Sequence, residues 1–131
     1  MSIKLTMYND IPMINVYLWS KKQNVYKNIV AVIDTGASVT TLSKDTLVML
    51  GYDVVNAEQS RVITASGIEY VSKLNLEKVQ IGNIELFDIK VHALTFPQES
   101  FTMGVIGMNI LRDFDLYLLF SQNELILKNQ V

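Results

Sequence analysis

The chain has 131 residues, 50% of them hydrophobic and 18% charged, which is enough for one folded domain and too few for two. Eleven Lys and Arg against 13 Asp and Glu give a formal charge of −2, so nucleic acid and anionic membranes are not expected partners. The lack of cysteine excludes disulfides, a thiol nucleophile and thiolate metal sites, and the single histidine, His92, excludes a metal site built from several histidines.

Membrane insertion and secretion are not expected either. No apolar run approaches the roughly 20 residues that a membrane helix needs. The segment Met1–Thr6 lacks the continuous apolar stretch of a secretion signal. We therefore expect one domain over residues 1–131, located in the cytoplasm, with no metal and no cofactor.

The first half of the chain predicts two strands followed by a short helix. Ile11–Trp19 contains alternating apolar residues, and Val25–Ile33 ends in five consecutive apolar residues. Such a run predicts a strand that is buried on both faces. Ser43 is a good N-cap for a helix over Lys44–Leu50, and Gly51 is a good stop residue.

The second half predicts three hairpins, a long loop and a second short helix. In the first hairpin, strands Arg61–Thr64 and Glu69–Lys73 flank the turn Ala65-Ser66-Gly67. In the second, strands Leu74–Ile81 and Ile84–Ala93 flank the two-residue turn Gly82-Asn83. In the third, strands Leu116–Phe120 and Glu124–Lys128 flank Ser121-Gln122-Asn123. The loop is expected at Phe96–Ser100, and the helix at Asn109–Phe114. Many short strands with two short helices predict an all-β fold, either a barrel or a sandwich.

The residues most informative about function are Asp34-Thr35-Gly36-Ala37-Ser38. Asp34 follows directly after the apolar run Ile29–Ile33, where a lone carboxylate would be costly to bury. The residues alone leave two arrangements open. Asp34 either caps backbone N–H groups in a turn, or shares a proton with a second carboxylate in a desolvated cleft.

The context of Asp34 carries a family resemblance that extends from about Val25 to Lys128. Val32-Ile33-Asp34-Thr35-Gly36-Ala37-Ser38 resembles the active-site motif of retropepsin-like aspartic peptidases. Val105-Ile106-Gly107-Met108-Asn109-Ile110-Leu111 resembles the second signature of that family. Thr64-Ala65-Ser66-Gly67 lies between the two, where the family has the tip of its flap, a mobile hairpin over the substrate cleft.

The resemblance implies a closed acid-protease-type barrel forming a single lobe, and a role for each matching residue. Asp34 would be the catalytic carboxylate and Thr35 would bond across a two-fold axis. Gly36 would donate its N–H, with Ala37 and Ser38 supporting the site. Thr64, Ala65, Ser66 and Gly67 would hold the peptide, while Val105, Ile106 and especially Gly107 would close the substructure behind the active-site loop.

A catalytic pair of carboxylates would require two copies of the chain. Of the seven aspartates only Asp34 is followed by Thr-Gly or Ser-Gly, and a chain of this length has one lobe. The expected enzyme is therefore a two-fold homodimer, an aspartic endopeptidase that hydrolyses peptide or protein substrates with a water activated by Asp34 from each chain.

Three features separate the chain from the viral enzymes. It has Ser38 where viral members usually have Asp, and Met108 where they have Arg, which resembles the cellular and bacterial branch. Its C-terminal segment Leu116–Lys128 predicts a whole hairpin, so we expect a differently built dimer interface. With Met1 only a few residues before the first strand, we expect control by dimerisation and not by a long inhibitory pro-segment.

Other interpretations remain open at this point. The same fold can serve as a non-catalytic dimerisation or peptide-binding module, and a monomeric lipocalin-like binder would have an apolar cavity. His92, in the alternating stretch Ile89–Leu94, is interpreted as a partly buried or surface residue and not as a catalytic base.

Overall fold

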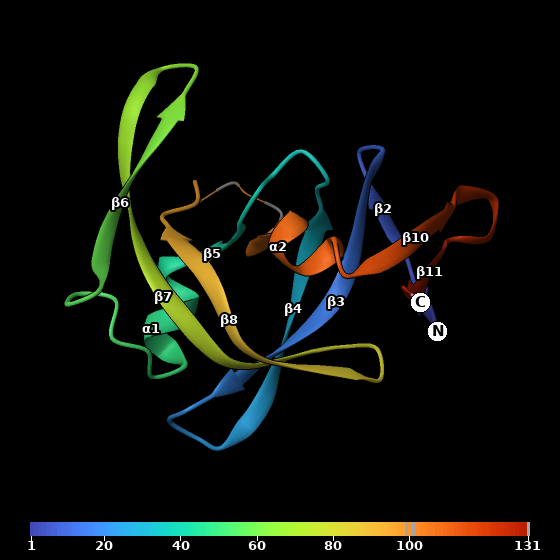
Figure 1. The fold of residues 1–131 in the computed structure, drawn as a ribbon, viewed down its shortest axis with the longest axis horizontal. Helices are drawn as coiled ribbons and strands as arrows, with labels where there is room; N and C mark the ends of the chain where they lie inside the picture. The colour runs from blue at the N-terminus through green and yellow to red at the C-terminus, as the bar shows by residue number, and fades with distance from the viewer. Residues whose placement is uncertain (99, 101, 131) are drawn as a thin grey trace.

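The computed structural model describes residues 1–98, 100 and 102–130, and Figure 1 shows how their strands are arranged. The fold is mostly β, as predicted, with two short α-helices. In chain order the elements are β1 (Ser2–Lys4), β2 (Thr6–Tyr8), β3 (Ile11–Ser20), β4 (Val25–Ile33), β5 (Thr40–Ser43), α1 (Lys44–Met49), β6 (Glu58–Thr64), β7 (Gly67–Ile81), β8 (Ile84–Leu94), β9 (Gly104–Ile106), α2 (Met108–Leu111), β10 (Phe114–Leu119), a 3-10 turn η1 (Phe120–Gln122) and β11 (Glu124–Asn129).

Eight strands form one curled sheet in the order β2-β3-β4-β9-β5-β8-β7-β6. The pairs β4–β9 and β5–β8 are parallel, and the other neighbours are antiparallel. The sheet curls until β3 meets β7, where Tyr17 pairs with Gln80 and Leu18 with Val79. Between β3 and β7 the described residues form only these two pairs, so the barrel is incompletely closed and the predicted closed barrel is corrected in this respect.

The core lies inside this curl and is built from alternate residues of its strands. Val16, Leu42, Leu76 and Val91 are fully buried. In β4 the residues Ile29, Ala31 and Ile33 are buried, whereas Val30 is 37% exposed. The prediction that this run is buried on both faces was therefore wrong, because the second face of β4 is open to solvent at Val30.

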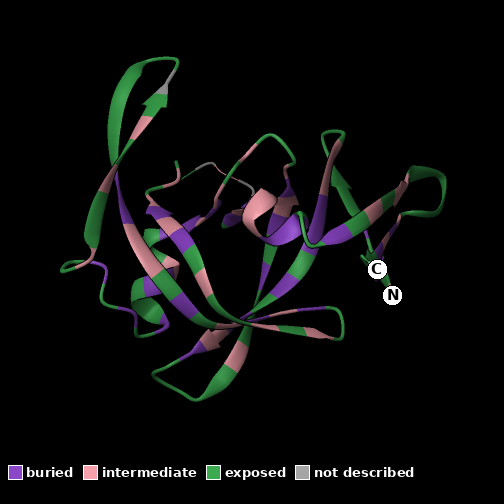
Figure 2. Cartoon of the chain, in the orientation of Figure 1, coloured by how far each residue is buried: buried purple, intermediate pink, exposed green. Residues whose placement is uncertain are grey.

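The three predicted hairpins form, but several bounds differ: β6 begins at Glu58, Gly67 belongs to β7 and not to the turn, and Phe120 belongs to η1. Ile81 pairs with Ile84 across the two-residue turn Gly82-Asn83, where Gly82 has a φ of +60°. The two strands expected at Glu69–Lys73 and Leu74–Ile81 are a single strand, β7, of 15 residues. Its first part pairs with β6 in a hairpin that projects from the body and is largely exposed at its end (Figure 2).

The two helices differ in how well the sequence predicted them. In α1 the Ser43 hydroxyl accepts the N–H of Thr46, and Gly51 follows the helix with a φ of +93°. The helix expected over Asn109–Phe114 ends at Leu111, so that prediction was wrong at its C-terminal end. Phe114 begins β10 instead, where it pairs with Asn129 and is buried in the core. Strand pairing with a distant segment therefore outweighs the local helical pattern.

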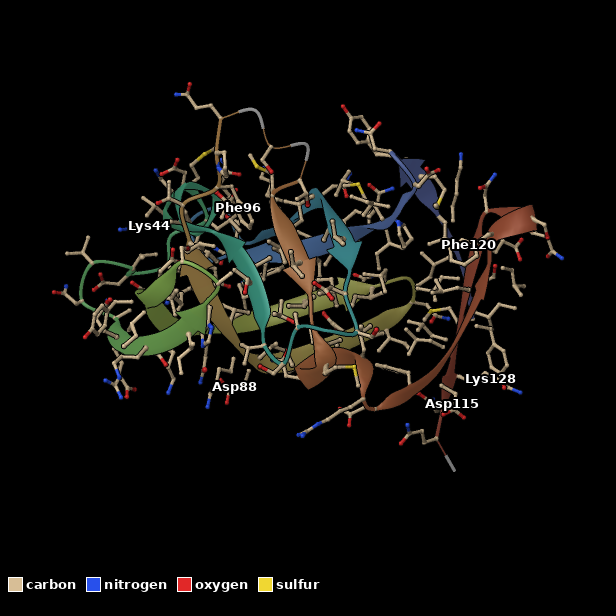
Figure 3. All side chains as sticks on the ribbon, turned by 90° about the horizontal axis from the view of Figure 1, so that it is seen from above. Lys44, Asp88, Phe96, Asp115, Phe120 and Lys128 are labelled. Atoms are coloured by element: carbon tan, nitrogen blue, oxygen red, sulfur yellow. The ribbon has the colours of Figure 1, made fainter. Side chains whose placement is uncertain are left out.

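A second, three-stranded sheet has the order β1-β11-β10 and lies at the end of the molecule opposite the β6–β7 hairpin (Figure 1). Figure 3 shows Phe120 and Lys128 at this end. The N-terminal strand is tied into it, because the Leu127 N–H donates to the Met1 carbonyl at 3.0 Å. Strands β1, β2, β5 and β9 were not predicted.

The long loop was expected at Phe96–Ser100, and its described residues indeed lie outside strands and helices, while Glu99 is outside the described residues. Within the described part of the chain, no helix has the length and apolar character needed to cross a bilayer.

Candidate active site

Asp34 directly follows the carboxyl end of β4, beside the second motif. Parallel pairing of β4 with β9 places Val32 opposite Val105 and Ile33 opposite Ile106. The Asp34 N–H then donates to the Ile106 carbonyl at 3.0 Å. The two motifs, far apart in the chain, therefore meet at the carboxyl ends of the neighbouring strands β4 and β9.

The carboxylate of Asp34 is held in a tight turn. Its Oδ1 accepts the N–H of Gly36 at 2.8 Å, and the Asp34 carbonyl accepts the N–H of Ala37 at 3.3 Å. Within residues 1–98, 100 and 102–130, Gly36 supplies the only hydrogen bond to this carboxylate. Asp34 is partly buried, whereas Thr35, Gly36 and Ser38 are exposed. In the single chain the geometry is thus that of the turn arrangement, with the loop facing solvent.

The segment around α2 supports this loop from behind. The Met108 N–H donates to the Ala37 carbonyl at 2.7 Å, and the Asn109 N–H donates to the Ser38 carbonyl at 3.1 Å. A Cβ atom on Gly107 would lie 2.8 Å from the Val39 carbonyl carbon and 2.9 Å from the Ala37 and Val39 carbonyl oxygens. Only glycine fits there without moving the backbone of the loop.

Asn109 joins three segments of the site, and its role was not predicted. Its Oδ1 accepts both the backbone N–H and the hydroxyl of Thr40 at 2.8 Å, and its Nδ2 donates to the Lys90 carbonyl at 2.8 Å. The Thr40 hydroxyl also accepts the Gly107 N–H at 3.1 Å. This network fixes the distance between the active-site loop, α2 and β8. The sequence position of Asn109 gave no sign of it, because all of its partners are remote in the chain.

Replacing Asn109 by Leu is expected to lower the free energy of unfolding by about 2 kcal/mol, because the N–H of Thr40, which is 1% exposed, loses its acceptor. Asn109→Asp keeps an acceptor for Thr40 and loses only the donor to Lys90, so its expected loss is smaller. Urea unfolding of both variants followed by the fluorescence of Trp19, the only tryptophan, measures the difference. Equal losses in the two variants would contradict this ranking.

A cavity of ≈ 590 Å³ lies between the active-site loop and the β6–β7 hairpin. Its lining includes Gly36, Ala37 and Ser38, which were all predicted site residues, together with Val39 from the continuation of the loop and Thr41 from β5. The hairpin contributes Arg61, Val62 and Ile63, and β8 contributes His92. The predicted flap residues Thr64, Ala65, Ser66 and Gly67 come next along the chain, where Thr64 pairs with Gly67 and Ala65-Ser66 forms the turn.

His92 is a site residue that the sequence interpretation missed. It pairs with Thr41 of β5 and with Lys73 of β7, and it lines the same cavity as Ser38. No hydrogen bond joins Ser38 and His92 in the described structure. The alternation of β8 already places His92 on the face opposite the buried Val91 and Ala93. That pattern could have shown which face His92 occupies, but not that the face lines a cleft.

The pKa of His92 lies below the usual value, first because burial disfavours the charged imidazolium and then because Lys73 and Lys90 repel it. The unfolded chain therefore binds the proton more readily than the folded one, and stability should fall as pH drops through and below the unfolded value of about 6.5. A proton NMR titration of this single imidazole should give a midpoint below that of the unfolded chain. A midpoint at or above it would contradict the burial.

No described group of three or more His, Asp and Glu side chains is placed to hold a metal ion.

Comparison with known proteins agrees with the geometry of the loop and its support. Residues 24–113 match the family model described as "gag-polyprotein putative aspartyl protease". No curated protein matches the chain.

A solved structure with a similar fold is the crystal structure of a retropepsin-like aspartic protease from Rickettsia conorii. It is 28% identical in sequence, and the match has a TM-score of 0.72 and covers 97% of this chain and 89% of that one. The family match spans both motifs and the hairpin between them, and the fold match spans nearly the whole chain. The chain therefore belongs to the gag-polyprotein aspartyl protease family and has the retropepsin-like fold of a bacterial aspartic peptidase.

Proposed function

We propose that the protein is an aspartic endopeptidase that works as a homodimer, with Asp34 of each chain forming the catalytic dyad. The observation that carries the proposal is the exposed loop around Asp34, which is held rigidly from behind and faces a cavity of ≈ 590 Å³. We further propose that residues 1–131 act as one domain, in the cytoplasm, on a peptide or protein substrate.

The surroundings of Asp34 support the proposed pairing of two chains. Inside one chain its carboxylate has the Gly36 N–H as its single described hydrogen-bond donor, and Thr35 is exposed beside it. A two-fold axis near Thr35 would bring two copies of Asp34 together and would cover the exposed loop. Gly36, Ala37 and Ser38 would then border the same cleft from both chains.

The chemistry of such a pair follows from two close carboxylates that share one proton. The ionised Asp34 removes a proton from a bound water, whose oxygen attacks the peptide carbonyl carbon. The protonated Asp34 of the other chain gives its proton to the carbonyl oxygen. The C–N bond then breaks as the leaving nitrogen takes the proton that the first Asp34 removed from water. A hydroxyl proton of the tetrahedral intermediate returns to the other Asp34 as the carboxyl product forms, and no bond forms between protein and substrate.

The alternative function is a peptide-binding or dimerisation module without hydrolysis. One observation favours it: the Asp34 carboxylate already has a structural role in the single chain, where it closes the turn with Gly36. Such a module would bind peptides in the same cavity and release them uncut.

Dilution tests the homodimer and the hydrolysis together. Purified protein incubated with a peptide library between acid and neutral pH should release cleavage products identified by mass spectrometry. The rate per chain should fall on dilution through the concentration at which sedimentation shows the dimer dissociating, because a single chain carries half of the dyad. Cleavage that stays proportional to protein concentration across that range would exclude a site shared between chains.

A further inference from the structure

We propose that Lys73 and Lys90 extend the cleft into a cationic subsite that selects substrates carrying an Asp or Glu side chain near the bond to be cut. The inference rests on the proposed function in that it takes the cavity beside Asp34 to be the peptide cleft. It adds the chemical class of substrate residue that this cleft prefers.

The strand register places both lysines beside the cavity. Lys73 of β7 lies directly opposite His92 of β8, and Lys90 precedes His92 by two residues in the same strand. Residues directly opposite in a sheet, and residues two apart in a strand, share one face. Because His92 lines the cavity beside Ser38, the two lysines continue the same surface outward.

The surface is also hollowed where the lysines lie. A second cavity, of ≈ 360 Å³, is lined by Glu58, Lys73, Leu74, Asn75 and Lys90. It adjoins the first through the Lys73–His92 pair. An extended peptide that leaves the first cavity along β8 would pass over this hollow, with every second side chain pointing into it.

Among the described residues that line this hollow, two lysines face one carboxylate, that of Glu58. The single ion pair here joins Lys73 to Glu58 at 4.0 Å, the limit of such contacts, and the Glu58 side chain is 77% exposed. No carboxylate in the described structure pairs with Lys90. Both lysines act on His92, whose pKa they lower after the larger effect of burial. Three further acidic residues lie along these strands: Asp88 precedes Lys90 by two residues in β8 and Glu77 follows Asn75 by two in β7, both exposed, while Glu69 lies further along the hairpin, opposite Val62. None of these three lines the hollow.

Arg61 is not included in the subsite. It lines the first cavity but pairs with Tyr70, one position away from the Val62–Glu69 pair. The second hollow has other lining residues, so Arg61 stays outside the subsite although it belongs to the cavity that His92 also lines.

Binding of paired peptides tests the subsite without requiring hydrolysis. The protein carries Asp34→Asn, so that peptides stay intact, and the probes are fluorescent peptides in which one Glu is moved through each position in turn, each beside its Gln counterpart. At one or two positions Glu should bind roughly three- to tenfold tighter than Gln at low ionic strength, the size expected for one or two partly exposed ion pairs. The difference should shrink in about 0.5 M NaCl.

Charge variants identify the groups responsible. Lys73→Gln combined with Lys90→Gln should remove the preference, and Lys90→Glu should favour Lys over Gln at the same position. Lys22→Gln, an exposed change in the β3–β4 turn, is the matched control and should leave the preference intact. The Glu peptide should also raise the titration midpoint of His92, and the Gln peptide should not.

The outcomes separate the subsite from the hydrolytic function. Equal binding of Glu and Gln peptides at every position, or a preference that survives both lysine substitutions, overturns the subsite even if wild-type protein cleaves peptides. A lysine-dependent Glu preference in a protein that cleaves nothing retains the subsite and removes the proposed hydrolysis.

Discussion

The Asp34→Asn variant is expected to lose peptide hydrolysis by a factor on the order of 10³ or more, because one substitution in the chain replaces both carboxylates of the dyad. The amide oxygen of Asn can still accept the Gly36 N–H that now bonds to Asp34 at 2.8 Å, so the turn should keep its shape. The loss should therefore appear in kcat, while peptide binding persists. Cleavage rates of wild type and variant, with binding measured on the same peptide, check both parts.

Asp88→Asn is the matched control for this experiment. Asp88 is exposed in β8, and its φ of 53° is a conformation that Asn tolerates as well as Asp. Figure 3 shows it at the surface. Hydrolysis by Asp88→Asn should equal that of wild type.

Adding excess Asp34→Asn chains to a fixed amount of wild type should lower activity through mixed dimers. Undiminished cleavage by Asp34→Asn would show that this carboxylate does no chemistry.

The Gly107→Ala variant is expected to lower the free energy of unfolding by about 3 kcal/mol. Its new methyl group would lie 2.8–2.9 Å from backbone atoms of Ala37 and Val39, which cannot swing aside as a side chain can. To make room, the active-site loop must move away from α2, so activity per folded molecule should fall as well. Urea unfolding followed by Trp19 fluorescence gives the stability, and peptide cleavage well below the midpoint gives the activity.

Gly104→Ala is the control for Gly107→Ala, because its new methyl group would come closest to a side-chain atom and not to backbone atoms. A Cβ at Gly104 would lie 2.7 Å from the Leu42 Cδ2 atom, which is the end of a side chain and not backbone, and at least 3.3 Å from the other nearest atoms. Its expected cost is about 1 kcal/mol. If the Gly107→Ala and Gly104→Ala variants lose the same free energy of unfolding, the active-site loop adjusts to the new methyl group more easily than its hydrogen bonds suggest.

Elements set by local chemistry were predictable from the sequence. The capping Ser43 and the terminating Gly51 gave the position of α1, and the pair Gly82-Asn83 gave the β7–β8 turn. The apolar run Ile29–Ile33 ends directly before Asp34, and β4 likewise ends at Ile33. These signals lie within a few residues of the feature that they predict.

Features set by distant pairing were not predictable. Strands β5 and β9 have four and three residues, too few for a clear alternation, and they form because β8 and β4 supply their partners. Asn109 and His92 belong to the site through partners in other elements. The extent of barrel closure depends on how far the sheet curls, which no local pattern records.

The pairing of β4 with β9 also bears on when the site can take shape during synthesis. The Asp34 N–H is held by the Ile106 carbonyl, and the Ala37 carbonyl is held by the Met108 N–H. A nascent chain emerging from the ribosome presents Asp34 long before either partner has been made, and such long-range contacts form late. The loop that carries the carboxylate can therefore acquire its final geometry only after translation has passed α2.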